Sequence, residues 1–450
     1  MTPRKRRKIA RREEASRHFL RAQAESREVE EAPDVGAERV WQALAAGFPG
    51  LRSGLDFQQA ALQQIGGARP FCVLWLRPDD SLDTWLRAPG PAVLAGVAAC
   101  LDEACRGAEG LWGVADSGLL VGFWPAWDAA QGLDAAQRLQ QQVRERTGRT
   151  VTIGVAAHPT LDYAPQEALE NARKAAEHAA FFGPDSRVVF DAVSLNISGD
   201  KYFERGDLRT AIYEFQQALR LDPRNGNVHN SLGVCYGVLG GHEAAIEAFG
   251  RALAIDPGDY MAVYNMGLIR GLQGRREAAL EHFLKADALH GDVFEILLQA
   301  GRLQLEMGDT AAARAGLERA VRLRPRSGNA QRMLGDCYAR LDMPEKAIGA
   351  YQKAVKANPA DSLALSALGG LFVQKGENPE IALVFCRESV RLAPDNPLFR
   401  QRLGRLYVKL NRLDAALSEF EQAERLGLDS AEDIRVARAR REQTGQVLND

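Results

Sequence analysis

The 450-residue sequence is poor in the features that mark secreted, membrane-spanning or strongly charged proteins. It has only six cysteines and no Cys-x-x-Cys pair, which excludes a disulfide scaffold. Cys100 and Cys105 have no histidine nearby, so we expect helix packing there rather than a metal site. The longest nearly continuous apolar stretch, residues 92–101, has about half the length that a membrane-crossing helix needs. We therefore expect a protein of the reducing cytoplasm without a membrane span.

Net charge is also nearly absent, because 57 Lys and Arg stand against 59 Asp and Glu. A net charge of −2 gives no overall attraction to nucleic acid or to a membrane. One local exception is RKRRKIARR at residues 4–12, which no apolar segment follows, so we do not expect a secretory signal peptide. We expect residues 1–37 to form a basic tail, disordered or a frayed helix. Docking of this tail on nucleic acid or on an anionic surface is the alternative.

Residues 192–429 repeat with a period of 34 or 35 residues. An alanine follows each recurring glycine by 12 or 13 residues, and a second small residue follows seven later. Each unit holds two apolar-periodic segments, which predicts two antiparallel helices that approach closely at the small residues. The recurring glycines are Gly199, Gly233, Gly267, Gly301, Gly335, Gly369 and Gly404.

This pattern resembles the tetratricopeptide repeat (TPR) family over residues 192 to about 430. The resemblance implies a right-handed α-solenoid of seven repeats, followed by a capping helix and tail at residues 430–450. It also implies that the first helix of each repeat lines a concave groove that holds a protein or peptide segment. The family's groove positions fall on Asn227, Asn230, Val234, Met261, Tyr264, Leu268, Glu295, Leu298, Arg302, Asn329, Arg332, Asp336, Arg340, Gln401, Arg405 and Lys409.

The side chains at these positions suggest what the groove would hold. Asparagine can bond a peptide main chain, and arginine can hold a carboxylate with two parallel hydrogen bonds. We therefore expect a partner segment with apolar anchors and an acidic portion or a free C-terminus. The alternative is that these polar residues are simply solvated on an exposed face.

Residues 38–190 lack the repeat and have the pattern of an α/β domain. Buried strands are expected at 71–76, 111–114, 119–125, 151–159 and 186–190, and helices at 92–106, 135–148 and 166–182. The order is β-α-β-β-α-β-α-β, with a tight hairpin at Asp116-Ser117-Gly118. The last strand runs almost directly into the first repeat without a Gly/Ser-rich linker, so we expect the two domains to be rigidly coupled.

This order resembles the GGDEF (diguanylate cyclase) family over about 140 residues. Pro49-Gly50-Leu51 and Phe57 stand at the family's threonine-glycine-leucine opening and the phenylalanine that follows it, and residues 151–156 match its late strand. The family's signature falls on residues 115–119. The resemblance implies a GGDEF-like, nucleotide-cyclase-like α/β sandwich.

The residues that the cyclase reaction needs are missing. The family's two metal-binding aspartates map to Leu74 and Leu76, the acidic pair of its signature to Ser117 and Gly118, and a phosphate-contacting lysine to Ala180. Magnesium requires oxygen ligands, which leucine cannot supply. The resemblance therefore implies a degenerate domain without catalysis, metal or cofactor.

Three functions are compatible with these patterns. The first is a non-catalytic cytoplasmic adaptor that binds a protein segment in its groove, with the α/β domain as a docking or regulatory module. The second is a sensor of cyclic di-GMP or another nucleotide, because Arg106 and Glu109 stand where the family has an Arg-x-x-Asp pair. The simpler interpretation of these two residues is an exposed helix end. The third is an altered metal-dependent nucleotide enzyme that uses Asp116 and the Asp79-Asp80 pair.

Overall fold

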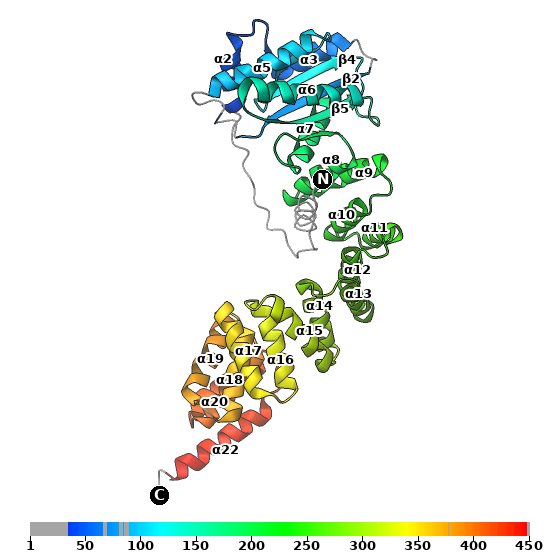
Figure 1. The fold of residues 1–450 in the computed structure, drawn as a ribbon. Coiled ribbons are helices and arrows are strands. Elements are labelled where there is room, and N and C mark those ends of the chain that lie inside the picture. Colours follow the sequence, from blue (N-terminus) through cyan, green and yellow to red (C-terminus); the bar gives the residue numbers. More distant parts are fainter. Residues whose placement is uncertain (1–34, 66–69, 81–83, 85–89, 377, 448–450) are drawn as a thin grey trace. The chain divides into compact units, whose positions relative to one another are not determined.

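The computed structural model describes residues 35–65, 70–80, 84, 90–376 and 378–447 (Figure 1). The predicted basic tail at residues 1–37 lies almost entirely outside these ranges. The chain divides into two compact units, Met1–Asn265 and Met266–Asp450, so the division lies within the third repeat. None of the described helices combines the length and the apolarity needed to cross a bilayer.

The first unit contains a six-stranded sheet with the order β1-β3-β4-β2-β5-β6. Strand β2 is antiparallel to both β4 and β5, while β1 pairs with β3 and β5 pairs with β6 in parallel. All five predicted strands are present, and only the two-residue β1 was not expected. Their bounds are β1 Arg52–Ser53, β2 Phe71–Pro78, β3 Leu111–Val114, β4 Leu120–Pro125, β5 Val151–His158 and β6 Arg187–Val189.

Helices cover both faces of this sheet. The side chains of β2 alternate between the two faces, as a strand requires. Leu74 and Leu76 belong to one buried cluster with α2, α5 and α6, while Val73 and Trp75 belong to another with α3 and α7. The predicted order of strands and helices is confirmed from β2 to β6, whereas α2 and α3, which come before β2, were not predicted. The helices are α2 Val35–Ala45, α3 Gly54–Ile65, α5 Gly90–Arg106, α6 Ala129–Thr147 and α7 Glu167–Ala180.

Small residues bring α7 very close to the sheet. A β-carbon on Gly154 of β5 would lie 2.0 Å from the carbonyl oxygen of Ala172 and 2.2 Å from the amide nitrogen of Ala176. Only glycine on the strand and alanines on the helix allow this approach.

Seven helix pairs and a terminal helix follow the sheet, as the period predicts. The recurring glycine of each first helix faces the second helix of the same repeat. A β-carbon on Gly335 would lie 2.7 Å from the Tyr351 ring, and one on Gly404 would lie 2.5 Å from the Phe420 ring. The glycine thus makes room for a large side chain of its partner helix. The pairs are α8 Ala192–Glu204 with α9 Leu208–Leu221, α10 Gly226–Val238 with α11 His242–Ile255, α12 Tyr260–Leu272 with α13 Arg276–Leu289, α14 Phe294–Glu306 with α15 Thr310–Leu323, α16 Gly328–Arg340 with α17 Pro344–Ala357, α18 Ser362–Lys375 with α19 Pro379–Leu392, and α20 Pro397–Lys409 with α21 Leu413–Arg425, before α22 Ala431–Val447.

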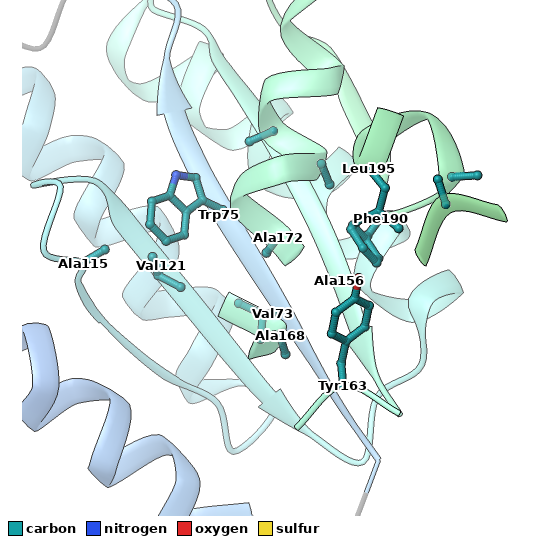
Figure 2. Close-up of a cluster of buried hydrophobic side chains, with 14 of the residues drawn as sticks. Val73, Trp75, Ala115, Val121, Ala156, Tyr163, Ala168, Ala172, Phe190 and Leu195 are labelled. Atoms are coloured by element: carbon teal, nitrogen blue, oxygen red, sulfur yellow. The ribbon is translucent and has the colours of Figure 1, made fainter. Parts of the chain in front are cut away.

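One hydrophobic core joins the sheet to the first two repeats inside the first unit. Phe190 and Leu195 link the end of the sheet to α8, and Phe215 of α9 continues the cluster. A buried ion pair accompanies this core, because Nζ of Lys174 on α7 lies 2.7 and 2.9 Å from the carboxylate oxygens of Glu214 on α9. The α/β part and the first repeat therefore share one core and one buried ion pair, which supports the expected coupling at this junction. Figure 2 shows part of this cluster, including Val73, Trp75, Ala115, Val121, Ala156, Tyr163, Ala168, Ala172, Phe190 and Leu195.

Candidate functional site

First helices of neighbouring repeats in the second unit contact one another. Helix α14 contacts α16, and α18 contacts α20, in addition to the contacts of each helix with its own partner. We call the face formed by α14, α16, α18 and α20 the inner surface. The predicted groove residues on these helices lie on this surface. Their hydrogen bonds and ion pairs show which of them already have partners within the protein.

Arg302 and Arg332 both have partners on this surface. The guanidinium of Arg302 donates to Glu306 at 2.7 Å, one turn along the same helix. That of Arg332 donates to the side-chain oxygen of Asn329 at 2.9 Å and lies 3.5 Å from a carboxylate oxygen of Asp361. Each positive charge is therefore partly neutralised within the protein.

The predicted groove acid Asp336 is also bonded. The Tyr351 hydroxyl donates to it at 2.6 Å, and Arg332 donates to its other oxygen at 3.4 Å. Burial raises the pKa of the Asp336 carboxyl, although these bonds and nearby arginines act in the opposite direction. This carboxylate holds the Tyr351 ring in place.

Helix α22 supplies a hydrogen-bond acceptor for two further groove residues. Arg405 donates to Asp433 of α22 from Nε and from a terminal nitrogen, both at 3.0 Å, and Gln401 donates to the same carboxylate at 2.9 Å. Lys409 donates to the carbonyl oxygen of Val373 at 2.5 Å. The predicted capping helix thus contributes an acidic side chain to the arginine that was expected to hold a partner's acid.

A pocket of about 320 Å³ opens among α16, α17, α18 and α20. One of its charged residues, Arg402, was missed because the groove positions assigned from the sequence do not include it. The available signal was its spacing against Ser366 and Gly370 of the preceding first helix, which leave room for an arginine. The pocket is lined by Ala339, Tyr351, Ala367, Gly370, Leu371, Val373, Gln374, Arg402 and Arg405.

The groove residues of the first unit are more enclosed. Asn230 is buried, and its side-chain oxygen accepts a hydrogen bond of 3.1 Å from the amide of Asn265, a fully buried residue that the sequence did not single out. Tyr264 is buried too, whereas Asn227 is exposed and lines a separate pocket of about 360 Å³. Leu268, which belongs to the second unit, is half-buried.

The positions mapped to cyclase catalysis have structural roles. Leu74 and Leu76 are buried in the central strand, and Ser117 and Gly118 form the hairpin turn, where Gly118 has a φ of 77°. Asp79, which the altered-enzyme alternative would use, accepts hydrogen bonds from the Thr152 hydroxyl at 2.5 Å and the Asp185 amide at 2.8 Å. Among the described residues, no group of three or more His, Cys, Asp or Glu could hold a metal ion.

The two residues of the proposed nucleotide pair have contacts with their own neighbours. Arg106 lies 2.7 Å from Asp102, one turn earlier on α5, and its side chain is 79% exposed. Glu109 lies beyond the helix end with a φ of 53°, and its carbonyl oxygen accepts a bond from Gln64. These contacts agree with the simpler interpretation, which is an exposed helix end.

A serine, a histidine and an aspartate also meet near the start of α8. The Ser194 hydroxyl donates to Asp191 at 2.8 Å, and Nδ1 of His178 lies 3.2 Å from each of them. Ser194 is fully buried, and its amide also bonds Asp191 in a capping box. This cluster fixes the beginning of α8.

Comparison with known proteins identifies the repeats. Residues 236–292, 298–362 and 342–397 match a family described as tetratricopeptide repeat, residues 199–240 match one described as TPR repeat, and residues 399–426 match a further tetratricopeptide repeat family. Together with the seven helix pairs, these matches show that the second half of the chain consists of TPR repeats. No curated protein matches the sequence.

Several solved structures resemble the helical part. PilF of Pseudomonas aeruginosa has 21% identity and a TM-score of 0.43, covering 46% of this chain and 95% of its own. A TPR protein from Parabacteroides merdae has 16% identity and a TM-score of 0.38, covering 55% of this chain and 96% of its own. YrrB, described as a TPR protein with an unusual peptide-binding site, has 20% identity and a TM-score of 0.39, covering 41% and 95%.

Proposed function

We propose that the protein is a non-catalytic adaptor that binds a protein or peptide segment on the first helices of its repeats. The observation that carries this is the exposure of large apolar side chains at groove positions. Leu363 and Leu398 each occupy the second place of a first helix in the second unit, and each is 50% exposed. Helices α18 and α20 contact each other, and apolar side chains that are exposed together and surrounded by polar ones are typical of interaction surfaces.

The α/β part is, in this proposal, a degenerate GGDEF-like domain that serves as a docking or regulatory module. Its order of strands and helices supports this, and Leu74 and Leu76 fill the core where the cyclase would place metal ligands. The six cysteines are free and buried, which suits a reducing cytoplasm.

Photo-crosslinking tests the location of the binding surface. Peptides would be selected against the full chain by display, and a photoreactive phenylalanine analogue would replace Leu363 or Leu398. The matched control replaces Val384, which is 65% exposed on the second helix of the same repeat as Leu363. Crosslinks from positions 363 and 398 but not from 384 are expected. Crosslinks from 384 alone, or failure to select any peptide, would contradict the proposal.

A nucleotide assay tests the other half of the proposal. Incubation of the full chain with labelled GTP and magnesium or manganese is expected to give no product, because the mapped metal positions are leucines. Calorimetry with cyclic di-GMP is expected to show no heat. Heat that disappears in Arg106→Ala would instead support the sensor function.

A further inference from the structure

The pocket on the inner surface holds one arginine that lacks an acidic partner. A terminal nitrogen of Arg402 donates to the Ser366 hydroxyl at 2.8 Å, and Ser366 is fully buried on α18. No described carboxylate forms an ion pair with Arg402. A neutral hydroxyl orients the guanidinium but does not neutralise it, and one hydrogen bond leaves most of its five N–H donors available.

The carboxylates near this pocket are already engaged. Asp336 accepts from Tyr351, whose ring lines the pocket, and Asp433 accepts from Arg405. Asp361 lies 3.5 Å from Arg332. Arg402 is therefore a positive charge without a counterpart, beside neighbours whose charges are paired.

The wall next to Arg402 is aliphatic and open. Ala339, Ala367, Leu371 and Val373 line it. At Gly370, the only atoms that a β-carbon would meet within 4 Å belong to Arg402, whose Cδ and Nε would lie 3.9 Å away. Space for a ligand group thus lies between an arginine and an apolar surface.

The geometry points to Arg402 as the residue that binds a carboxylate of the partner segment, with an adjacent aliphatic side chain of that segment against Leu371 and Val373. This inference rests on the proposed function and names the chemistry that the groove recognises. The carboxylate comes from an Asp or Glu side chain or from a free C-terminus, since both present the same pair of oxygens to a guanidinium. Arg302, Arg332 and Arg405, the three arginines expected from the sequence, are held by the protein's own acids.

The test measures fluorescence anisotropy of three labelled 12-residue peptides built from leucine, alanine and serine, added to the full chain. One peptide has a free C-terminus, the second is amidated with a central glutamate, and the third is amidated without an acid. We expect one acidic peptide to bind at least about tenfold more tightly than the third, and the tighter of the two identifies the source of the carboxylate. Equal binding of all three overturns the inference but leaves the proposed function standing. Failure of all three to bind contradicts both.

Variants then assign the preference to Arg402. Arg402→Gln is expected to abolish the roughly tenfold preference, while the neutral peptide binds as before. The matched control is Arg391→Gln on α19, where the arginine pairs only with Glu388 of its own helix in the described structure. A preference that survives Arg402→Gln overturns the assignment.

A steric variant tests the pocket without changing charge. Gly370→Leu would fill the space beside Arg402, and leucine has a higher helix propensity than glycine, so α18 should remain folded. We expect this variant to lower the affinity for the acidic peptide at least about tenfold and to leave the circular dichroism spectrum unchanged. Unchanged affinity with an unchanged spectrum would show that the carboxylate binds elsewhere.

Discussion

Two basic residues in two regions of the molecule have opposite surroundings. In the first unit, Lys174 is buried between α7 and α9, and both oxygens of Glu214 lie within hydrogen-bond distance of it. In the second unit, Arg402 lines an open pocket and bonds a neutral hydroxyl. A charged side chain that is buried and ion-paired contributes only to structure. An accessible charged side chain without an ion pair can bind a ligand.

The contrast separates the roles of the two regions. The buried pair and the continuous core attach the first repeat to the α/β part. The first helices of the later repeats keep apolar side chains and a cation accessible. The four changes below test this division, from the largest expected effect to the smallest.

Breaking the buried pair should have the largest effect. Glu214→Leu leaves Lys174 buried without a counter-charge and is expected to lower the free energy of unfolding by about 3–5 kcal/mol. All six tryptophans of the sequence lie between residues 41 and 127, so tryptophan fluorescence during urea unfolding reports on the α/β part. Although residue 214 lies in the repeats, the fluorescence transition should shift.

The double variant Lys174→Met with Glu214→Leu is the control, because it removes both charges. It is expected to be close to the wild type in stability. A single variant no less stable than the double one would show that the pair does not couple the repeat to the α/β part.

A smaller loss of stability is expected from a substitution at Gly335, where α16 packs against α17 beside the pocket. Gly335→Ala places a methyl group 2.7 Å from the ring of Tyr351, which lines the pocket, and should cost about 1–3 kcal/mol. Gly349→Ala is the matched control, since nothing lies within 4 Å of its β-carbon position and alanine favours a helix by up to about 1 kcal/mol. Circular dichroism during urea unfolding should show opposite shifts. Equal shifts would contradict the close packing of Gly335 on Tyr351.

Asp200 on α8 is an acidic residue of the first unit that, like Arg402 in the second, has no partner of opposite charge in the part of the chain that the structure describes. Its side chain has no ion pair or hydrogen bond with any described residue, and burial, with Glu204 nearby, raises the pKa of its carboxyl from 3.8 to about 8. A raised carboxyl pKa contributes stability that is fully present below about pH 4 and is lost as the pH rises toward 8. Asp200→Asn should therefore be more stable than the wild type at pH 8, by about 1–2 kcal/mol, and should lose this advantage at pH 4. A pH-independent difference in urea unfolding would contradict this.

The smallest effect on stability is expected at the capping helix. Asp433→Asn weakens the ion pair with Arg405, whose side chain is 56% exposed, so the loss should be about 1 kcal/mol or less. It also frees a second arginine of the pocket, so the acidic peptide should bind more tightly, as anisotropy would measure. Weaker binding would show that Asp433 supports the site rather than competes for it.

Local spacing was enough to predict most of the fold. The recurrence of Gly335 and its equivalents gave all seven helix pairs, because the close approach of two helices imposes a fixed period. The strands of the α/β part were found from apolar runs such as residues 71–76. The short β1 was missed because two residues, Arg52 and Ser53, carry no pattern.

The candidate site was less accessible to sequence reasoning. A family's groove positions say which side chains face inward, but they do not say which of them already have partners. Arg405 was expected to bind a partner, yet Asp433 occupies it from a helix 28 residues later in the chain. Arg402 was missed because its importance depends on Ser366 and Gly370 of another repeat. Ion pairing and free space are properties of the packed structure.

The most direct test of this account observes the guanidinium of Arg402 itself. The Nε–H signals of arginine side chains in the isotope-labelled full chain can be followed by NMR, with Arg402 assigned from the signal that Arg402→Lys removes. Addition of the tighter acidic peptide is predicted to shift the Arg402 signal to saturation, while the amidated neutral peptide leaves it in place. An acidic peptide that binds but moves only other arginine signals would contradict the central claim.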